Sequence, residues 1–218
     1  SSSLRVAYAL RERGVGTGEP VLLAQPTGFE FLSTFFGLQA VGAIPMPLGW
    51  PGGADLLRGP ANMARWRRLA SRYGARVLIC GALEGRTILP PHPLELVIDQ
   101  AQLLEGVATR VEFEAHQTGP ADIAYIQSTS GTTGAPRGVR LTQEGIYASV
   151  EAIGQRIEAR DDDILVSWLP MDNIMGLVGV VFFALHWNIR PVLMPPERFL
   201  AHPEDWFWAI SDHRATLS

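Results

Sequence analysis

This sequence of 218 residues contains no lysine, and its eighteen basic residues other than histidine are all arginines. No side chain can therefore form a Schiff base, act as a lysine general base or provide the lysine of a P-loop. Cysteine is also scarce. Cys80 stands alone in the apolar run Arg-Val-Leu-Ile-Cys, without a partner for an internal disulfide. We expect it to be a buried spectator.

Clustered positive charge and long hydrophobic runs are missing too. The net charge of −4 and the pI of about 5.7 do not favour a nucleic-acid partner. The longest apolar stretch, 175–187, is shorter than the ~20 residues of a membrane span and predicts a buried helix. Residues 1–14 predict an amphipathic helix, not a signal peptide. The five histidines show no metal-ligand spacing. We therefore expect a cytoplasmic protein without a membrane span or a metal centre of its own.

Short β-type runs alternate with segments of helical periodicity along the chain. The expected strands are 19–25, 43–47, 76–80, 94–99, 123–127, 139–141, 163–169 and 191–194. The expected helices after the first are 29–41, 61–74, one that follows an N-cap at Thr142, 175–187 and 203–210. This alternation is typical of an α/β fold with mostly parallel sheets covered by helices. Linker-like composition between about 100 and 120 suggests two lobes, 1–100 and 120–218.

The stretch Ser-Thr-Ser-Gly-Thr-Thr-Gly-Ala-Pro-Arg-Gly at 128–138 follows a predicted buried strand. Glycines let the backbone approach an anion, hydroxyls add donors and a cation balances charge, so the stretch predicts a phosphate-binding loop. Arg137 offers a guanidinium fork suited to phosphate oxygens. The candidate ligands are Thr129, Ser130, Gly131, Thr132, Thr133, Gly134, Arg137 and Gly138. Without an anion, we expect a loop with several free N–H groups.

Other interpretations of this stretch fit less well. A P-loop would need glycine and lysine where Pro136 and Arg137 stand. A serine amidase would need a lysine base, and a Gly-x-Ser-x-Gly elbow is absent. An ordinary polar surface turn remains the structural alternative. Gly-Val-Gly-Thr-Gly at 14–18 follows a helix and precedes a strand, the reverse of a dinucleotide loop, so we interpret it as a connection.

The stretch 125–139, Tyr-Ile-Gln-Ser-Thr-Ser-Gly-Thr-Thr-Gly-Ala-Pro-Arg-Gly-Val, resembles the nucleotide-phosphate signature of the adenylate-forming superfamily. This superfamily includes acyl-CoA synthetases, luciferases and the adenylation domains of peptide synthetases. The stretch 166–179, Val-Ser-Trp-Leu-Pro-Met-Asp-Asn-Ile-Met-Gly-Leu-Val-Gly, is similar to a motif of its fatty acyl-AMP ligases. Residues 28–45 and 192–218 also resemble that group, so the resemblance covers essentially the whole chain.

The resemblance implies the first part of the large N-terminal domain of an adenylate-forming enzyme. Such an enzyme uses ATP and Mg²⁺ to join a fatty acid to AMP. It then passes the acyl group to the thiol of an acyl carrier protein or of a polyketide or peptide synthetase module. By resemblance, Asp172, Asn173, Met175 and Gly176 would line a substrate pocket. The residues for adenine, ribose and Mg²⁺, and a C-terminal domain with a catalytic lysine, would follow Ser218, so we assign no catalytic residue and expect these 218 residues alone to be inactive.

Two departures from the family pattern keep a second interpretation open. Arg137 replaces the loop lysine, and Asp172, Asn173 and Ile174 stand where fatty acyl-AMP ligases have Tyr-His-Asp. Asn173 cannot gain positive charge, and Ile174 cannot act as a carboxylate. The chain could thus come from a degenerate adenylation-like domain that binds without turnover. The intact loop hydroxyls and glycines favour an active ligase.

Overall fold

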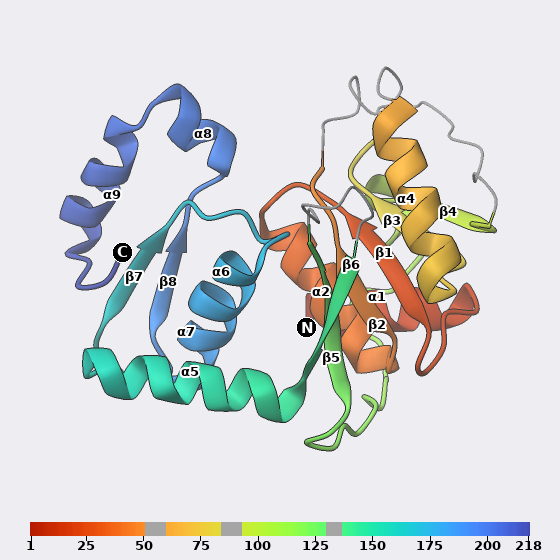
Figure 1. Cartoon of the computed structure of the whole chain (residues 1–218), viewed down its shortest axis with the longest axis horizontal. Coiled ribbons are helices and arrows are strands. Elements are labelled where there is room, and N and C mark those ends of the chain that lie inside the picture. The colour runs from red at the N-terminus through yellow and green to blue at the C-terminus, as the bar shows by residue number, and fades with distance from the viewer. Residues whose placement is uncertain (51–59, 84–92, 130–136) are drawn as a thin grey trace. The chain divides into compact units, whose positions relative to one another are not determined.

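A computed structural model describes residues 1–50, 60–83, 93–129 and 137–218 (Figure 1). The chain divides into two compact units, Ser1–Leu141 and Thr142–Ser218, and each is described by itself. The division expected from composition, into lobes 1–100 and 120–218, stays a prediction about domain organisation.

The first unit is built on a parallel sheet. Its strands are β1 (Pro20–Ala24), β2 (Ile44–Pro47), β3 (Val77–Cys80) and β4 (Leu96–Asp99), in the order β2-β1-β3-β4. Val21 stands opposite Pro45 on one side and Val77 on the other. All of β3, and all of β1 after Pro20, is buried. Continuous apolar strands of this kind are stable in parallel sheets because helices cover both faces.

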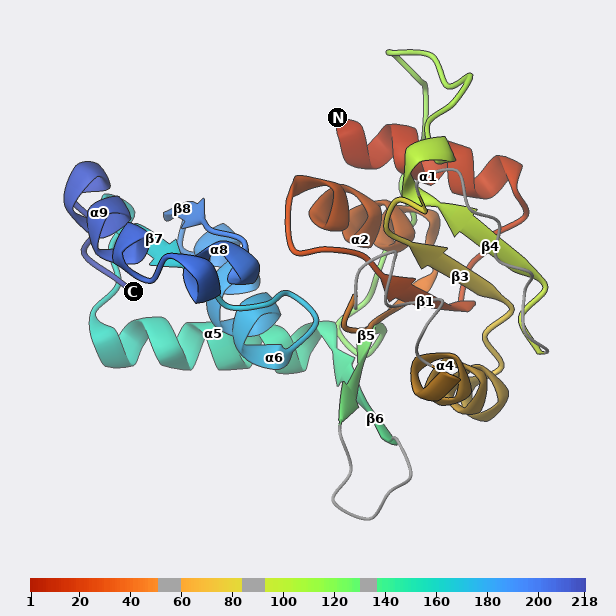
Figure 2. The same cartoon turned by 90° about the horizontal axis from the view of Figure 1, so that it is seen from above.

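Helices cover both faces of this sheet in the structure (Figure 2). α1 (Ser2–Glu12) and α2 (Phe29–Val41) lie on one face, and α4 (Pro60–Tyr73) lies on the other. α1 and α2 approach so closely that a Cβ on Gly37 would lie 2.5 Å from the Val6 side chain. The expected α/β fold with a parallel sheet is confirmed.

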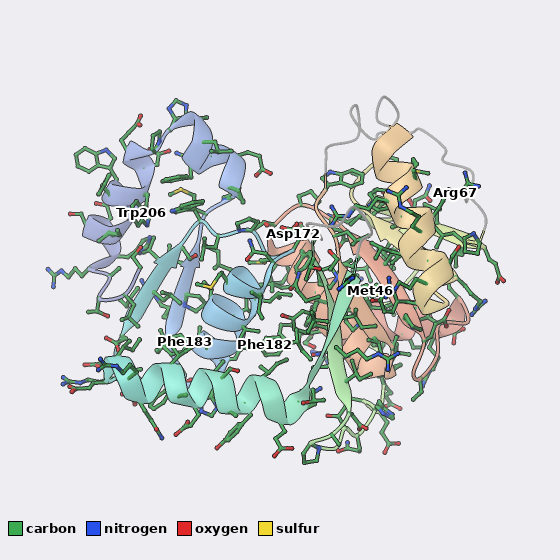
Figure 3. All side chains as sticks on the ribbon, in the orientation of Figure 1. Met46, Arg67, Asp172, Phe182, Phe183 and Trp206 are labelled. Carbon is green, nitrogen blue, oxygen red and sulfur yellow. The ribbon has the colours of Figure 1, made fainter. Side chains whose placement is uncertain are left out.

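α4 is anchored by its apolar face. Trp66 and Leu69 are almost fully buried against Leu22 and Leu78 of the two central strands. Met46, at the end of the same layer, is also fully buried (Figure 3). Burial of large apolar side chains is worth about 1.5–3 kcal/mol each, so this layer fixes α4 on the sheet.

Cys80 is buried in this layer, as expected. Burial, together with the charge of Asp99, raises the pKa of its thiol to about 12. Its Sγ donates weakly to the Ile98 carbonyl, at 3.6 Å. Because the thiolate is the reactive form, this cysteine is chemically inert in the folded chain.

A second, two-stranded sheet completes the first unit and leads into the candidate site. It consists of β5 (Ile123–Thr129) and β6 (Arg137–Thr142). β5 packs beside β2, and the Gln39 side chain of α2 donates to the Ala124 carbonyl at 3.0 Å. Tyr125 is fully buried in β5, and burial raises the pKa of its phenol. A short 3₁₀ turn, η1 (Gln100–Gln102), follows β4.

The second unit pairs β7 (Ile164–Ser167) in parallel with β8 (Arg190–Leu193). Its helices are α5 (Gln143–Ile157), α6 (Ile174–Gly176), the π-helix η2 (Leu177–Phe182), α7 (Phe183–His186), α8 (Pro196–Ala201) and α9 (Glu204–His213). The expected helix 175–187 is thus present with a π-helical centre, whereas α8 was not expected. No described helix is long and apolar enough to cross a membrane.

The N-cap expected at Thr142 is confirmed. The Thr142 hydroxyl caps α5 by accepting from the Gly145 N–H at 3.1 Å. The final residues add an extended segment to the sheet, since Leu217 forms a parallel bridge with Leu165. On α5, Ile146 and Val150 are buried, whereas Ile153 and Ile157 are exposed. The apolar face therefore packs only along the first part of the helix.

Gly154 of α5 lies against the indole of Trp187, the residue that directly follows α7. A Cβ there would overlap the indole of Trp187, whose Nε1–H donates to the Val150 carbonyl at 3.0 Å. The glycine leaves the space that this ring occupies, and any side chain would push the indole away from its acceptor.

We predict that Gly154→Ala lowers the free energy of unfolding by about 1–3 kcal/mol, the usual cost of overpacking. Gly179→Ala is the matched control. Its Cβ would meet nothing closer than the Met175 methyl at 3.9 Å, so a neutral or slightly stabilising effect is expected. Urea denaturation of both variants measures the difference. Equal midpoints would contradict the packing described for Gly154.

Candidate phosphate-binding loop

The predicted loop connects β5 to β6, and the structure describes both of its ends. Ser128 and Thr129 finish β5, and Arg137 and Gly138 begin β6. The predicted ligands Ser130, Gly131, Thr132, Thr133 and Gly134 lie outside the described residues, so their roles stay predictions.

The second strand starts earlier than the sequence suggested. We expected 128–138 to be loop and 139–141 to be extended, but Arg137 and Gly138 already belong to β6. Hydrogen bonds at the base of the loop explain the difference. The Thr129 hydroxyl donates to the Arg137 carbonyl at 3.3 Å and so ties the end of one strand to the start of the next. The Thr129 hydroxyl proton is thereby engaged within the chain, and the hydroxyl oxygen can still accept a hydrogen bond.

Gly138 is held by the phenol of Tyr73, the last residue of α4. The Gly138 N–H donates to the Tyr73 oxygen, and the Tyr73 hydroxyl donates to the Gly138 carbonyl at 3.1 Å. A Cβ on Gly138 would lie 2.5 Å from Ile126 Cγ2 and 2.8 Å from the Tyr73 oxygen. The Gly138 N–H is therefore not among the several free N–H groups expected of the loop, and the lack of a side chain at Gly138 makes room for the phenol.

Ser128, at the other end of the loop, is held by α4 as well. Arg65 Nη2 donates to the Ser128 Oγ at 3.3 Å, and that hydroxyl donates to the Pro47 carbonyl at 3.4 Å. Sequence reasoning missed Arg65 and Tyr73 as parts of the site. An arginine-faced helix was visible in the sequence, but its contact with residues more than sixty positions away was not.

Arg137 is the positively charged residue at the described ends of the loop. It is exposed, and its guanidinium makes no hydrogen bond or ion pair with the described part of the chain. Its backbone carbonyl is fixed by Thr129, while the side chain keeps all five N–H donors. A backbone fixed directly after an exposed guanidinium suits the binding of an external anion such as phosphate.

The second group of predicted residues lies at the start of α6, in the other compact unit. Asn173 caps this helix, its Oδ1 accepting from the Gly176 N–H at 3.0 Å. Gly176 is buried against the Pro170 carbonyl with no room for a Cβ. Met175 is 60% exposed, and Asp172 is partly buried (Figure 3). Their expected place in a substrate pocket stays a prediction, while the Asn173 amide has a clear structural role as an N-cap.

A resident metal centre is not apparent in the described ranges. No group of three or more His, Cys, Asp or Glu side chains comes together there. Mg²⁺ that is bound with a nucleotide usually takes one or two carboxylates together with phosphate oxygens and waters, not a dedicated cluster. The nearest fit to the predicted chemistry is an anion site at the ends of the loop.

A family of known proteins matches the chain throughout: residues 1–218 fit the family described as AMP-binding enzyme. Among curated proteins, the phenyloxazoline synthase MbtB of Mycolicibacterium paratuberculosis is 31% identical over 99% of this chain and 17% of its own length. The medium-chain-fatty-acid–[acyl-carrier-protein] ligase TtuA of Teredinibacter turnerae is 28% identical over 93% of this chain and 37% of its own length. The chain thus spans well under half the length of these relatives.

Solved structures of similar fold give the same picture. Fatty acyl-adenylate ligases studied from E. coli and L. pneumophila include one that matches with a TM-score of 0.81 and 28% identity, over 98% of this chain and 38% of the other. A fatty acyl-adenylate ligase from L. pneumophila, in complex with acyl adenylate and pyrophosphate, matches with a TM-score of 0.82. At 24% identity over 99% of this chain and 37% of that one, the latter likeness concerns the fold alone.

We predict that Gly138→Ala lowers the free energy of unfolding by about 1–3 kcal/mol, because the new methyl group would displace Tyr73 or Ile126. Gly16→Ala is the matched control in the same unit, since nothing lies within 4 Å of its added Cβ. Urea denaturation compares the two variants. An unchanged midpoint for Gly138→Ala would show that the phenol does not occupy this space in solution.

Proposed function

Because the chain belongs to the AMP-binding enzyme family, we propose that it forms the first part of an ATP-dependent fatty acyl-AMP ligase. The observation that carries this proposal is the base of the loop between β5 and β6. There Thr129 and Tyr73 fix the peptide group that joins Arg137 to Gly138, and the exposed guanidinium makes no described hydrogen bond or ion pair that would compete with an anion. The names of the relatives support fatty acids as the substrate class, since both TtuA and the structurally similar ligases act on fatty acids.

In the proposed reaction, a carboxylate oxygen of the fatty acid attacks the α-phosphorus of ATP. The new bond forms the acyl-adenylate, the bond to the β-phosphate breaks, and pyrophosphate leaves. Two anions must approach each other, so the reaction depends on charge neutralisation and on alignment of the reacting atoms. We infer that Arg137, with other hydroxyls and N–H groups of the loop between β5 and β6, binds and orients the β- and γ-phosphates of ATP.

Mg²⁺ would neutralise further phosphate charge when bound. By resemblance to adenylate-forming enzymes, its protein ligand would lie in a later part of the longer protein. The acyl group would then pass from the acyl-adenylate to the thiol of an acyl carrier protein or of a synthetase module, forming a thioester and releasing AMP. This assignment is supported by TtuA, whose name specifies an acyl-carrier-protein ligase.

Acyl-adenylate formation in the longer protein tests the proposal. Fatty-acid-dependent exchange of pyrophosphate into ATP, measured with medium- and long-chain acids, should exceed the rate without acid. A carrier protein with a phosphopantetheine arm should then gain the mass of the acyl group. ATP binding without exchange for any acid would contradict the ligase assignment and favour a binding domain without turnover. If the longer protein did not bind ATP at all, the assignment of a nucleotide site would be contradicted as well.

We predict that Arg137→Ala weakens ATP binding by the longer protein about ten- to a hundredfold, since charge-assisted contacts are typically worth ~1.5–3 kcal/mol. Arg137→Lys should retain more affinity, because a point charge still binds phosphate. The fold should persist, because Arg137 is exposed. Isothermal titration calorimetry measures the affinities.

Arg140→Ala is the matched control for this prediction. Arg140 is an exposed arginine of the same strand, three positions further along β6, and should leave the ATP affinity unchanged. Equal losses in both variants would indicate a general electrostatic effect. Wild-type affinity in Arg137→Ala would show that this guanidinium is only a solvated strand residue.

A further inference from the structure

One helix contacts both ends of the candidate loop. Arg65 on α4 donates to the Ser128 hydroxyl at 3.3 Å, and Tyr73 on the same helix binds both backbone groups of Gly138. The two residues are eight positions apart, which corresponds to about 12 Å along a helix. α4 therefore bridges the end of β5 and the start of β6.

The core of the first unit holds α4 rigidly between these two contacts. Trp66, Leu69 and Ala70 are 2%, 0% and 0% exposed and pack on the sheet, and the Tyr73 ring packs against the same cluster. Close-packed interiors of this kind deform little. The positions of Arg65 and Tyr73 are thus set by the sheet, not by the loop.

The Tyr73 hydroxyl forms two hydrogen bonds with a single residue, Gly138. Its single proton goes to the Gly138 carbonyl, and its oxygen accepts the Gly138 N–H. Gly138 directly follows Arg137, whose carbonyl accepts from Thr129. The peptide group that joins Arg137 to Gly138 is therefore held at both of its polar atoms. Thr129 binds its carbonyl oxygen, and Tyr73 of α4 binds its N–H.

We propose that Tyr73 is a positioning residue for the phosphate loop, with Arg65 as its counterpart at the other end. Tyr73 fixes the backbone from which the Arg137 guanidinium extends, and Arg65 fixes Ser128 where the loop begins. The residues act through the loop without touching the nucleotide. This inference rests on the proposed function, because it assigns the loop to ATP phosphates.

The test uses Tyr73→Phe in the longer protein, which keeps the ring in the core and removes only the hydroxyl. Loss of both hydrogen bonds should raise the KM and Kd for ATP about three- to tenfold. The KM for the fatty acid should stay within about twofold, because the change concerns phosphate binding only. Tyr8→Phe is the matched control, a phenol of the same unit with no described hydrogen bond to Gly138, and should behave as wild type.

Arg65 provides an independent arm of the test. Arg65→Met should raise the KM for ATP, and Arg65→Lys should recover part of the loss, because one ammonium donor can replace the single Nη2 contact. Arg68→Met is the control, since Arg68 is exposed on the same helix and makes none of the described hydrogen bonds to Ser128. A pure charge effect of the helix would make the two methionine variants equal and would overturn the role of Arg65.

Hydrogen exchange gives a readout that does not depend on turnover. The segment 137–142 should exchange faster in Tyr73→Phe without nucleotide, and ATP should slow this exchange in the wild type. Faster exchange with unchanged ATP affinity, or lowered stability alone, would mean that Tyr73 only supports the fold and would overturn the inference. A wild type that does not bind ATP would overturn the proposed function, and the inference with it.

Discussion

Burial of β1 and β3 between two layers of helices is the constraint on which the rest of the first unit depends. These strands are apolar on both faces, so they are stable only when α1 and α2 cover one side and α4 covers the other. The same burial makes Cys80 inert and raises its pKa. It also fixes the direction of α4, because Trp66 and Leu69 must face the sheet. The polar residues of α4 are thereby placed where the strand ends of β5 and β6 can reach them.

The candidate site uses this rigidity at its edges. The hydroxyl of Thr129 and the phenol of Tyr73 satisfy backbone groups around Arg137 and Gly138, so a strand begins where a flexible loop was expected. The guanidinium of Arg137 is left exposed beside them. A fixed backbone next to a free cation lowers the cost of ordering when an anion binds. Under the proposed function, the apolar core positions α4, and α4 in turn positions the backbone next to the cation that binds phosphate.

The departures from the family pattern have different structural meanings. Arg137 keeps the charge of the loop lysine but offers a planar fork in place of a point charge. Asn173 caps α6 through its side-chain amide, a task that needs an acceptor oxygen and no ionisable group. The Asn173 side chain thus has a structural role that a neutral amide fills. In the second unit, Gly154 plays the same part for Trp187 that Gly138 plays for Tyr73. The absence of a side chain leaves space for an aromatic ring.

The sequence by itself determined the α/β class, most strand and helix positions and the family, because alternating apolar periodicity and the hydroxyl- and glycine-rich stretch at 128–138 are local patterns. It determined the cap at Thr142 for the same reason. Only the tertiary structure decided that β6 begins at Arg137, that η2 is a π-helix and that Asn173 serves as a cap. Only the fold brought Tyr73 and Arg65 to the loop. Those contacts join residues far apart in the chain, and they arise because burial of one helix face determines where its polar residues point.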